Sequence, residues 1–154
     1  MRITKYNVEM NMEKLPALVK EVAFNYDMPN VTNPKYAVKL MNDVFNLANK
    51  TEEYVFMVAL NTKGKVLGVF EISHGIINAS LVQPREILMR SLLINASSMI
   101  IVHNHPSGDT TPSNDDKNIK ERIKSAGAII GIDLLDFIII GDNYYSFKEN
   151  SLLS

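Results

Sequence analysis

Two of the chain's three histidines, His103 and His105, stand two positions apart at the end of an apolar segment, 98–102. If that segment is a strand, residues i and i+2 point to the same face, so both imidazoles face one point. Two nitrogen ligands can then be offered to a single metal ion. The spacing alone also fits a chance pair of polar residues at a strand end.

The next segment, 106–112, is rich in turn residues and precedes an expected helix over 113–126, with Gly127 near its end. The chain must reverse there, which brings Asp116 back over the end of the strand. Two neutral imidazoles and one carboxylate leave a tetrahedral Zn²⁺ one open position for water, as in catalytic zinc sites. Ser113 and Asp116 also fit a capping box, and we expect capping and metal ligation to compete for the Asp116 carboxylate.

Hydrolysis at such a site needs a proton acceptor, which is usually a carboxylate. The upstream candidates are Glu52, Glu53, Glu71 and Glu86, and the residue types leave all four open. Glu71 lies within an apolar segment, whereas Glu86 lies in the first turn of an expected helix, where the macrodipole alone explains an acidic residue. The third histidine, His74, precedes a glycine and is predicted to be a turn residue rather than a ligand.

The composition excludes several classes of site. The chain has 154 residues, no cysteine and a formal net charge of −1. Without cysteine there is no disulfide framework, thiolate zinc ribbon, iron–sulfur cluster or cysteine nucleophile, so any metal must be held by histidine and carboxylate.

The charge balance and the short apolar runs argue against two classes of partner, nucleic acid and membrane. A net charge of −1 argues against a dominant nucleic-acid interface, although a local basic patch is compatible with one. The lysines of the expected third helix are interrupted by Glu121, which predicts a solvated face. No signal-peptide pattern and no apolar run near the roughly 18 residues of a membrane helix is present, so we expect a soluble cytoplasmic protein without a membrane partner.

Hydrophobic patterns predict the elements that position these residues. Residues 1–33 are expected to form an arm with one strand and an Asn- and Pro-rich loop, after which Asn33 caps a helix that begins at Pro34. A second helix begins at Pro84. Strands are expected at 54–60 and 66–72, which form a hairpin, and at 98–102, 134–140 and 144–147. This order favours an α/β fold in which a mixed sheet carries helices on its faces.

Five residues match a known signature. His103, His105, Pro106, Ser113 and Asp116 fit the pattern H-x-H-P, six residues, S-x-x-D without a gap. On this motif the chain resembles the RadC-like proteins, a branch of the Jab/MPN (JAMM) zinc metallopeptidase superfamily. The similarity extends over about residues 34–153 and includes the segments Pro84-Arg85-Glu86, Asn95-Ala96 and Leu135-Asp136.

The resemblance implies a single-domain α-β-α sandwich over 34–154, with a mixed, curved sheet flanked by helices, of the Jab/MPN-like and cytidine-deaminase-like kind. It implies Zn²⁺ held by His103, His105 and Asp116, with Glu53 as general base and Ser113 stabilising the tetrahedral intermediate. The implied activity is zinc-dependent hydrolysis of amide or isopeptide bonds in a protein or peptide substrate.

The family's naming gives an alternative function, a DNA-repair or mobile-element accessory protein whose metal site is structural or vestigial. The chain also departs from the family at Phe137 and Thr110, where His and Pro are frequent. Neither position is a predicted ligand, so the departures leave the implied metal site unchanged.

Overall fold

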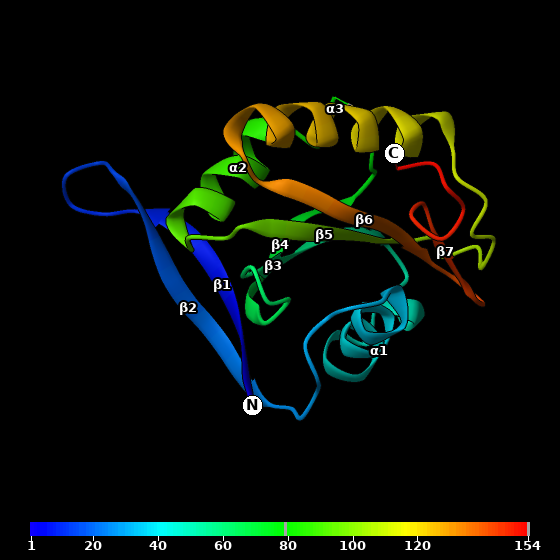
Figure 1. Ribbon diagram of the computed structural model, residues 1–154, viewed down its shortest axis with the longest axis horizontal. Helices are drawn as coiled ribbons and strands as arrows, with labels where there is room; N and C mark the ends of the chain where they lie inside the picture. Colours follow the sequence, from blue (N-terminus) through cyan, green and yellow to red (C-terminus); the bar gives the residue numbers. More distant parts are fainter. Residues whose placement is uncertain (79, 154) are drawn as a thin grey trace.

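Seven strands form one sheet with helices on both faces (Figure 1). The structure is a computed structural model that describes residues 1–78 and 80–153, so the last residue of the expected domain, 154, lies outside the described residues. The strands are β1 (Arg2–Met10), β2 (Pro16–Asn25), β3 (Glu53–Leu60), β4 (Val66–Gly75), β5 (Ser98–Asn104), β6 (Asp133–Ile140) and β7 (Tyr144–Ser146). The helices are α1 (Pro34–Phe45), α2 (Pro84–Leu93) and α3 (Asn114–Ile130), with a short 3₁₀ helix η1 (Leu47–Asn49).

The sheet is mixed and its order is β2-β1-β4-β3-β5-β6-β7. Strands β1 and β4, and β5 and β6, pair in parallel, and the other neighbours are antiparallel. Helix α1 covers one face and α2 and α3 cover the other (Figure 1). These features confirm the expected α/β sandwich.

Both faces of the central strands are buried, which explains their continuous apolar sequences. Along β3, Val55, Met57 and Ala59 pack in the cluster that includes α2 and α3 residues. The alternate residues of β3, Phe56 and Val58, pack with α1 residues on the opposite face. The side-chain alternation of a strand therefore decides which helix layer each residue contacts.

The N-terminal segment differs from the expectation of one strand. Strands β1 and β2 form an antiparallel hairpin, and β1 adds to the sheet through parallel pairs of Lys5 with Val69 and Tyr6 with Phe70. A register shift leaves Glu21 as an extra residue in β2, which breaks the alternating pattern from which a second strand is recognised. The boundary placed at residue 33 stays a prediction.

Helix α3 ends later than its sequence indicates. It begins after Ser113, as predicted, but it continues through Gly127 to Ile130 and is capped by Gly131, which adopts a left-handed φ of 86°. A Cβ atom at position 127 would collide with the carbonyl oxygen of Ile132, so this glycine provides close packing instead of a helix end. At α1, Pro34 is the first helical residue as predicted, but the Asn33 side chain makes no capping hydrogen bond.

Three elements meet at one end of the sheet. Because β3 and β5 are antiparallel, with Val55 opposite His103, the start of β3 lies beside the end of β5. The loop after β5 then leads to the N-terminus of α3. Within residues 1–78 and 80–153, no helix combines the length and the hydropathy needed to span a membrane.

Candidate metal centre

The two histidines of the H-x-H motif face one another across a short gap. His103 lies in β5 and His105 follows the strand, and their ring centroids are 4.9 Å apart. The Nδ1 atom of His103 lies 2.9 Å from the carbonyl oxygen of Tyr54, and that of His105 lies 2.7 Å from the carbonyl oxygen of Asp109. A carbonyl oxygen only accepts hydrogen bonds, so each Nδ1 carries a hydrogen. In the neutral rings, both Nε2 atoms then present a lone pair, as metal-binding histidines do.

Both lone pairs are directed towards the carboxylate of Asp116. Its Oδ1 atom lies 3.5 Å from Nε2 of His103, and its Oδ2 atom lies 3.2 Å from Nε2 of His105. Asp116 and His103 are each only 2% exposed. Lone pairs on nitrogen and on a carboxylate repel one another in a buried site, so this arrangement requires a positive charge between them, either a proton or a metal ion.

The carboxylate of Asp116 also closes a capping box at the start of α3. Ser113 Oγ accepts a hydrogen bond from the Asp116 backbone N–H at 3.0 Å, and Asp116 Oδ2 accepts one from the Ser113 backbone N–H at 2.8 Å. The capping box therefore forms as expected, and the competition between capping and metal ligation stays a prediction. A carboxylate has about four lone-pair sites, so the bond from Ser113 orients the group and leaves oxygen lone pairs for a proton or a metal ion.

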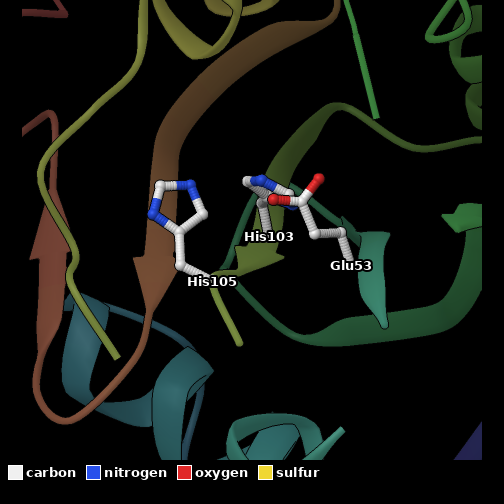
Figure 2. A group of neighbouring side chains, drawn as sticks. All are labelled: Glu53, His103 and His105. Atoms are coloured by element: carbon white, nitrogen blue, oxygen red, sulfur yellow. The ribbon is translucent and has the colours of Figure 1, made fainter. Parts of the chain in front are cut away.

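Glu53 is the glutamate that reaches the histidines. Figure 2 shows its carboxylate beside the His103 ring, and one atom from each of Glu53, His103 and His105 lies within 4.8 Å of the others. Glu53 begins β3 and shares the face of Val55, which is the face covered by α3. Successive side chains along a strand point to opposite faces, so the side chain of the neighbouring Glu52 does not share the face of Glu53.

The other candidate bases lie elsewhere. Glu71 Oε2 is 3.7 Å from Nδ1 of His74, and Glu86 forms ion pairs with Arg85 and Arg90. The prediction of His74 as a turn residue is wrong, because it lies in β4 and its ring stacks on Tyr54 at a centroid distance of 5.2 Å.

One cavity of about 210 Å³ unites the five residues predicted for the site. Its lining consists of Glu53, Ile77, His103, His105, Pro106, Ser107, Ser113 and Asp116. A second, more open cavity of about 520 Å³ shares Glu53 and Pro106 with the first. The site is therefore a small polar cavity beside a larger, more open one, and Glu53 lies where the two meet.

Burial and neighbouring charges shift the pKa values of the titratable side chains that line the cavity. Burial lowers the pKa of the His103 imidazole, against the opposing effects of Tyr54 and Asp116. The hydrogen bond with Asp116 raises the pKa of His105. Burial raises the pKa of Asp116, but hydrogen bonds from His105 and from the Ser113 backbone, with the charge of His103, outweigh it and hold this pKa below its ordinary value. Asp116 is thus an ionised carboxylate at neutral pH, the form that binds a metal.

Two features of the structure were not apparent in the sequence. Asn104, between the two histidines, is 1% exposed and hydrogen-bonds to the chain around Glu53. Its place in an apolar strand was the only signal for its burial. On α3 the expected solvated face is wrong for Lys120, because this residue is buried and its Nζ donates to the carbonyl oxygen of Leu152 at 2.9 Å.

Comparisons with known proteins agree with this architecture. A family model described as the RadC-like JAB domain matches residues 31–152. A UPF0758 protein of Clostridium tetani is 47% identical over 125 residues, which are 80% of this chain and 54% of that protein. A UPF0758 protein of Chlorobium luteolum is 38% identical over 146 residues, 91% of this chain and 66% of that protein.

The chain spans about half the length of several of these curated relatives, including a UPF0758 protein of Clostridium beijerinckii that is 46% identical and covered to 56%. The names of these relatives state no activity. The family model covers most of the chain and includes every residue of the cavity. From the match of the family model over residues 31–152 and the identity with these relatives, the chain belongs to the RadC-like JAB domain family.

Proposed function

We propose that the chain is a zinc-dependent hydrolase that cleaves an amide or isopeptide bond in a protein or peptide substrate. The observation that carries the proposal is the convergence of two histidine Nε2 lone pairs on the Asp116 carboxylate, with both Nδ1 hydrogens donated to carbonyl oxygens. Two neutral imidazoles and one carboxylate suit a tetrahedral zinc ion with one open position. The donor set therefore fits zinc, held by His103, His105 and Asp116.

Bound there, zinc would polarise the scissile carbonyl and lower the pKa of a water molecule towards about 7. Glu53 lies on the cavity wall and accepts the proton of the attacking water, then passes it to the leaving amine nitrogen. The Ser113 hydroxyl accepts a hydrogen bond from the Asp116 backbone and keeps its own hydrogen, which it donates to the oxygen on which negative charge develops. The carbonyl oxygens of Tyr54 and Asp109 hold the two imidazoles in the ligating tautomer.

The test is metal analysis followed by a search for hydrolysis with the full chain. We expect about one zinc per chain after zinc-supplemented purification, and cleavage of isopeptide-linked or linear peptides detected by mass spectrometry. Glu53→Gln should keep the zinc and lose cleavage, because an amide keeps the size of the carboxylate but accepts no proton. Glu52→Gln is the matched control, since Glu52 lines only the neighbouring cavity and not the one that contains the histidines.

Two results would count against the proposal. A zinc-free protein after zinc-supplemented purification would contradict the metal site, and undiminished cleavage by Glu53→Gln would contradict the role of Glu53. Salt-dependent retention on DNA by a protein that hydrolyses nothing would instead favour the alternative accessory role, because phosphate contacts weaken steeply with salt.

A further inference from the structure

Asn104 is a buried polar residue between the two histidines of the motif. It ends β5, is 1% exposed, and has the opposite strand parity to His103 and His105. Its side chain therefore belongs to the α1 face of the sheet, whereas the cavity lies on the α3 face. A buried amide that is not in the cavity requires hydrogen-bond partners, and those partners indicate its role.

The Asn104 amide binds both peptide groups that flank Glu53. Its Oδ1 atom accepts a hydrogen bond from the Tyr54 backbone N–H at 2.6 Å, and its Nδ2 atom donates one to the Glu52 carbonyl oxygen at 3.0 Å. One side chain thus fixes the backbone immediately before and after Glu53.

These two bonds begin where the backbone ladder ends. The β3–β5 pairing runs from Leu60 opposite Ser98 to Val55 opposite His103, and no further pair follows. Beyond it, the Asn104 side chain takes the place of a backbone peptide, while the other side of Asn104 still pairs with Ile140 of β6.

The neighbouring histidine adds a third bond to the same segment. His103 Nδ1 donates to the carbonyl oxygen of Tyr54, so consecutive residues of β5 hold both polar backbone atoms of Tyr54. On its other side, Glu53 pairs with Gly75, whose φ is 103°, at the end of β4. The backbone around Glu53 is therefore held by the β4 ladder on one side and by the side chains of Asn104 and His103 on the other.

We propose that Asn104 is a positioning residue that fixes the Glu53 carboxylate relative to the two histidines. A proton acceptor loses efficiency when it is displaced by a fraction of an ångström, so the strand start that carries it must be rigid. The catalytic meaning of this role rests on the proposed function, whereas the tether itself does not.

Two structural measurements on the full chain test the tether without any substrate. In Asn104→Ala, hydrogen exchange of the Tyr54 amide should accelerate at least tenfold, and the nuclear Overhauser contact between the Glu53 side chain and the His103 ring should weaken or vanish. Asn61→Ala is the matched control, because Asn61 follows the other end of β3 and accepts backbone bonds from Lys63 and Lys65. It should leave both measurements unchanged.

A conservative variant covers the case in which Asn104→Ala does not fold. Asn104→Asp keeps the acceptor for the Tyr54 N–H but cannot donate to the Glu52 carbonyl oxygen. The Tyr54 amide should therefore stay protected, while the contact between Glu53 and His103 weakens.

Kinetics then separate positioning from general destabilisation. We expect Asn104→Ala to lower kcat about 10- to 100-fold with little change in KM and no loss of zinc, because a displaced proton acceptor impairs the reaction without weakening substrate binding. The proposal would be overturned if Asn104→Ala kept the Tyr54 amide as protected, and the contact between Glu53 and His103 as strong, as they are in Asn61→Ala. An undiminished kcat in Asn104→Ala would also overturn it. If the wild-type chain hydrolyses nothing, the proposed function fails, and the exchange and contact measurements still decide whether Asn104 places Glu53.

Discussion

Replacing Asp116 with alanine separates the two roles of its carboxylate, because only one of them depends on zinc. Without metal, Asp116→Ala loses the hydrogen bond from the Ser113 backbone that closes the capping box. With zinc, the variant also lacks one of the three proposed ligands. We therefore expect a small loss of stability in the metal-free protein and a much larger one when zinc is present.

The expected loss of stability and the expected shift in Tm follow from the contacts that each variant loses. Loss of a helix N-cap interaction costs about 1 kcal/mol. A ligand at a hundred times its dissociation constant that binds only the folded state adds about 2.7 kcal/mol. For a domain of this size each kcal/mol moves Tm by roughly 2–4 °C. Zinc should thus raise the Tm of the wild type by roughly 5–11 °C.

The assay is thermal unfolding of the full chain with a chelator and with excess zinc. Ser113→Ala is the matched control, because it loses the bond from the Asp116 N–H to Ser113 Oγ but keeps every proposed ligand. It should melt a few degrees lower in both conditions and keep the full increase with zinc. Asp116→Ala should show a similar loss with chelator and almost no increase with zinc. An equal zinc-induced increase in both variants would refute the assignment of Asp116 as a ligand.

Four further results are expected. Ser113→Ala should lower kcat by roughly one to three powers of ten, and Ser113→Asp should not restore it, because a fixed negative charge opposes the developing oxyanion; a stable, fully active Ser113→Asp protein would make the serine a cap only. Glu53→Gln should keep one zinc by elemental analysis while single-turnover cleavage disappears. Gly127→Ala should lower the free energy of unfolding in urea by about 1–3 kcal/mol despite the higher helix propensity of alanine, because the added Cβ meets a backbone carbonyl. In chelator-treated protein, the raised pKa of His105 contributes stability that is present below about pH 6.5 and is lost as the pH rises through the folded-state pKa. The stability difference between wild type and His105→Gln should therefore shrink over that rise, and a constant difference in urea titrations would contradict this cause.

The sequence predicted those parts of the fold that depend on local rules. Pro34 and Pro84 begin helices because a fixed φ and a missing N–H suit the first helical position. The pairing of His103 with His105 follows from the two-residue period of a strand, and Ser113 is recognisable as a cap from its spacing to Asp116.

Features set by distant contacts could not be predicted in the same way. Gly127 resembles a helix end until the carbonyl oxygen of Ile132 is placed against it, and only then does Gly131 take that role. The choice of Glu53 among four glutamates needed the register of β3 against β5. The hydrogen bonds of Asn104 join residues about fifty positions apart, for which a single sequence holds no local signal.

The long outer strand of the N-terminal hairpin also bears on self-association. An exposed edge strand is a template for pairing with another molecule, and β2, ten residues long, forms one edge of the sheet. When two copies of one strand pair antiparallel, the symmetry axis places a residue opposite its own counterpart. Registers centred on the middle of β2 would thus set Lys20 against Lys20 or Glu21 against Glu21, and like charges in such pairs are unfavourable. Glu21 is also the bulged residue, so both the charges and the bulge at the middle of β2 disfavour pairing of this edge with a second copy in the central registers.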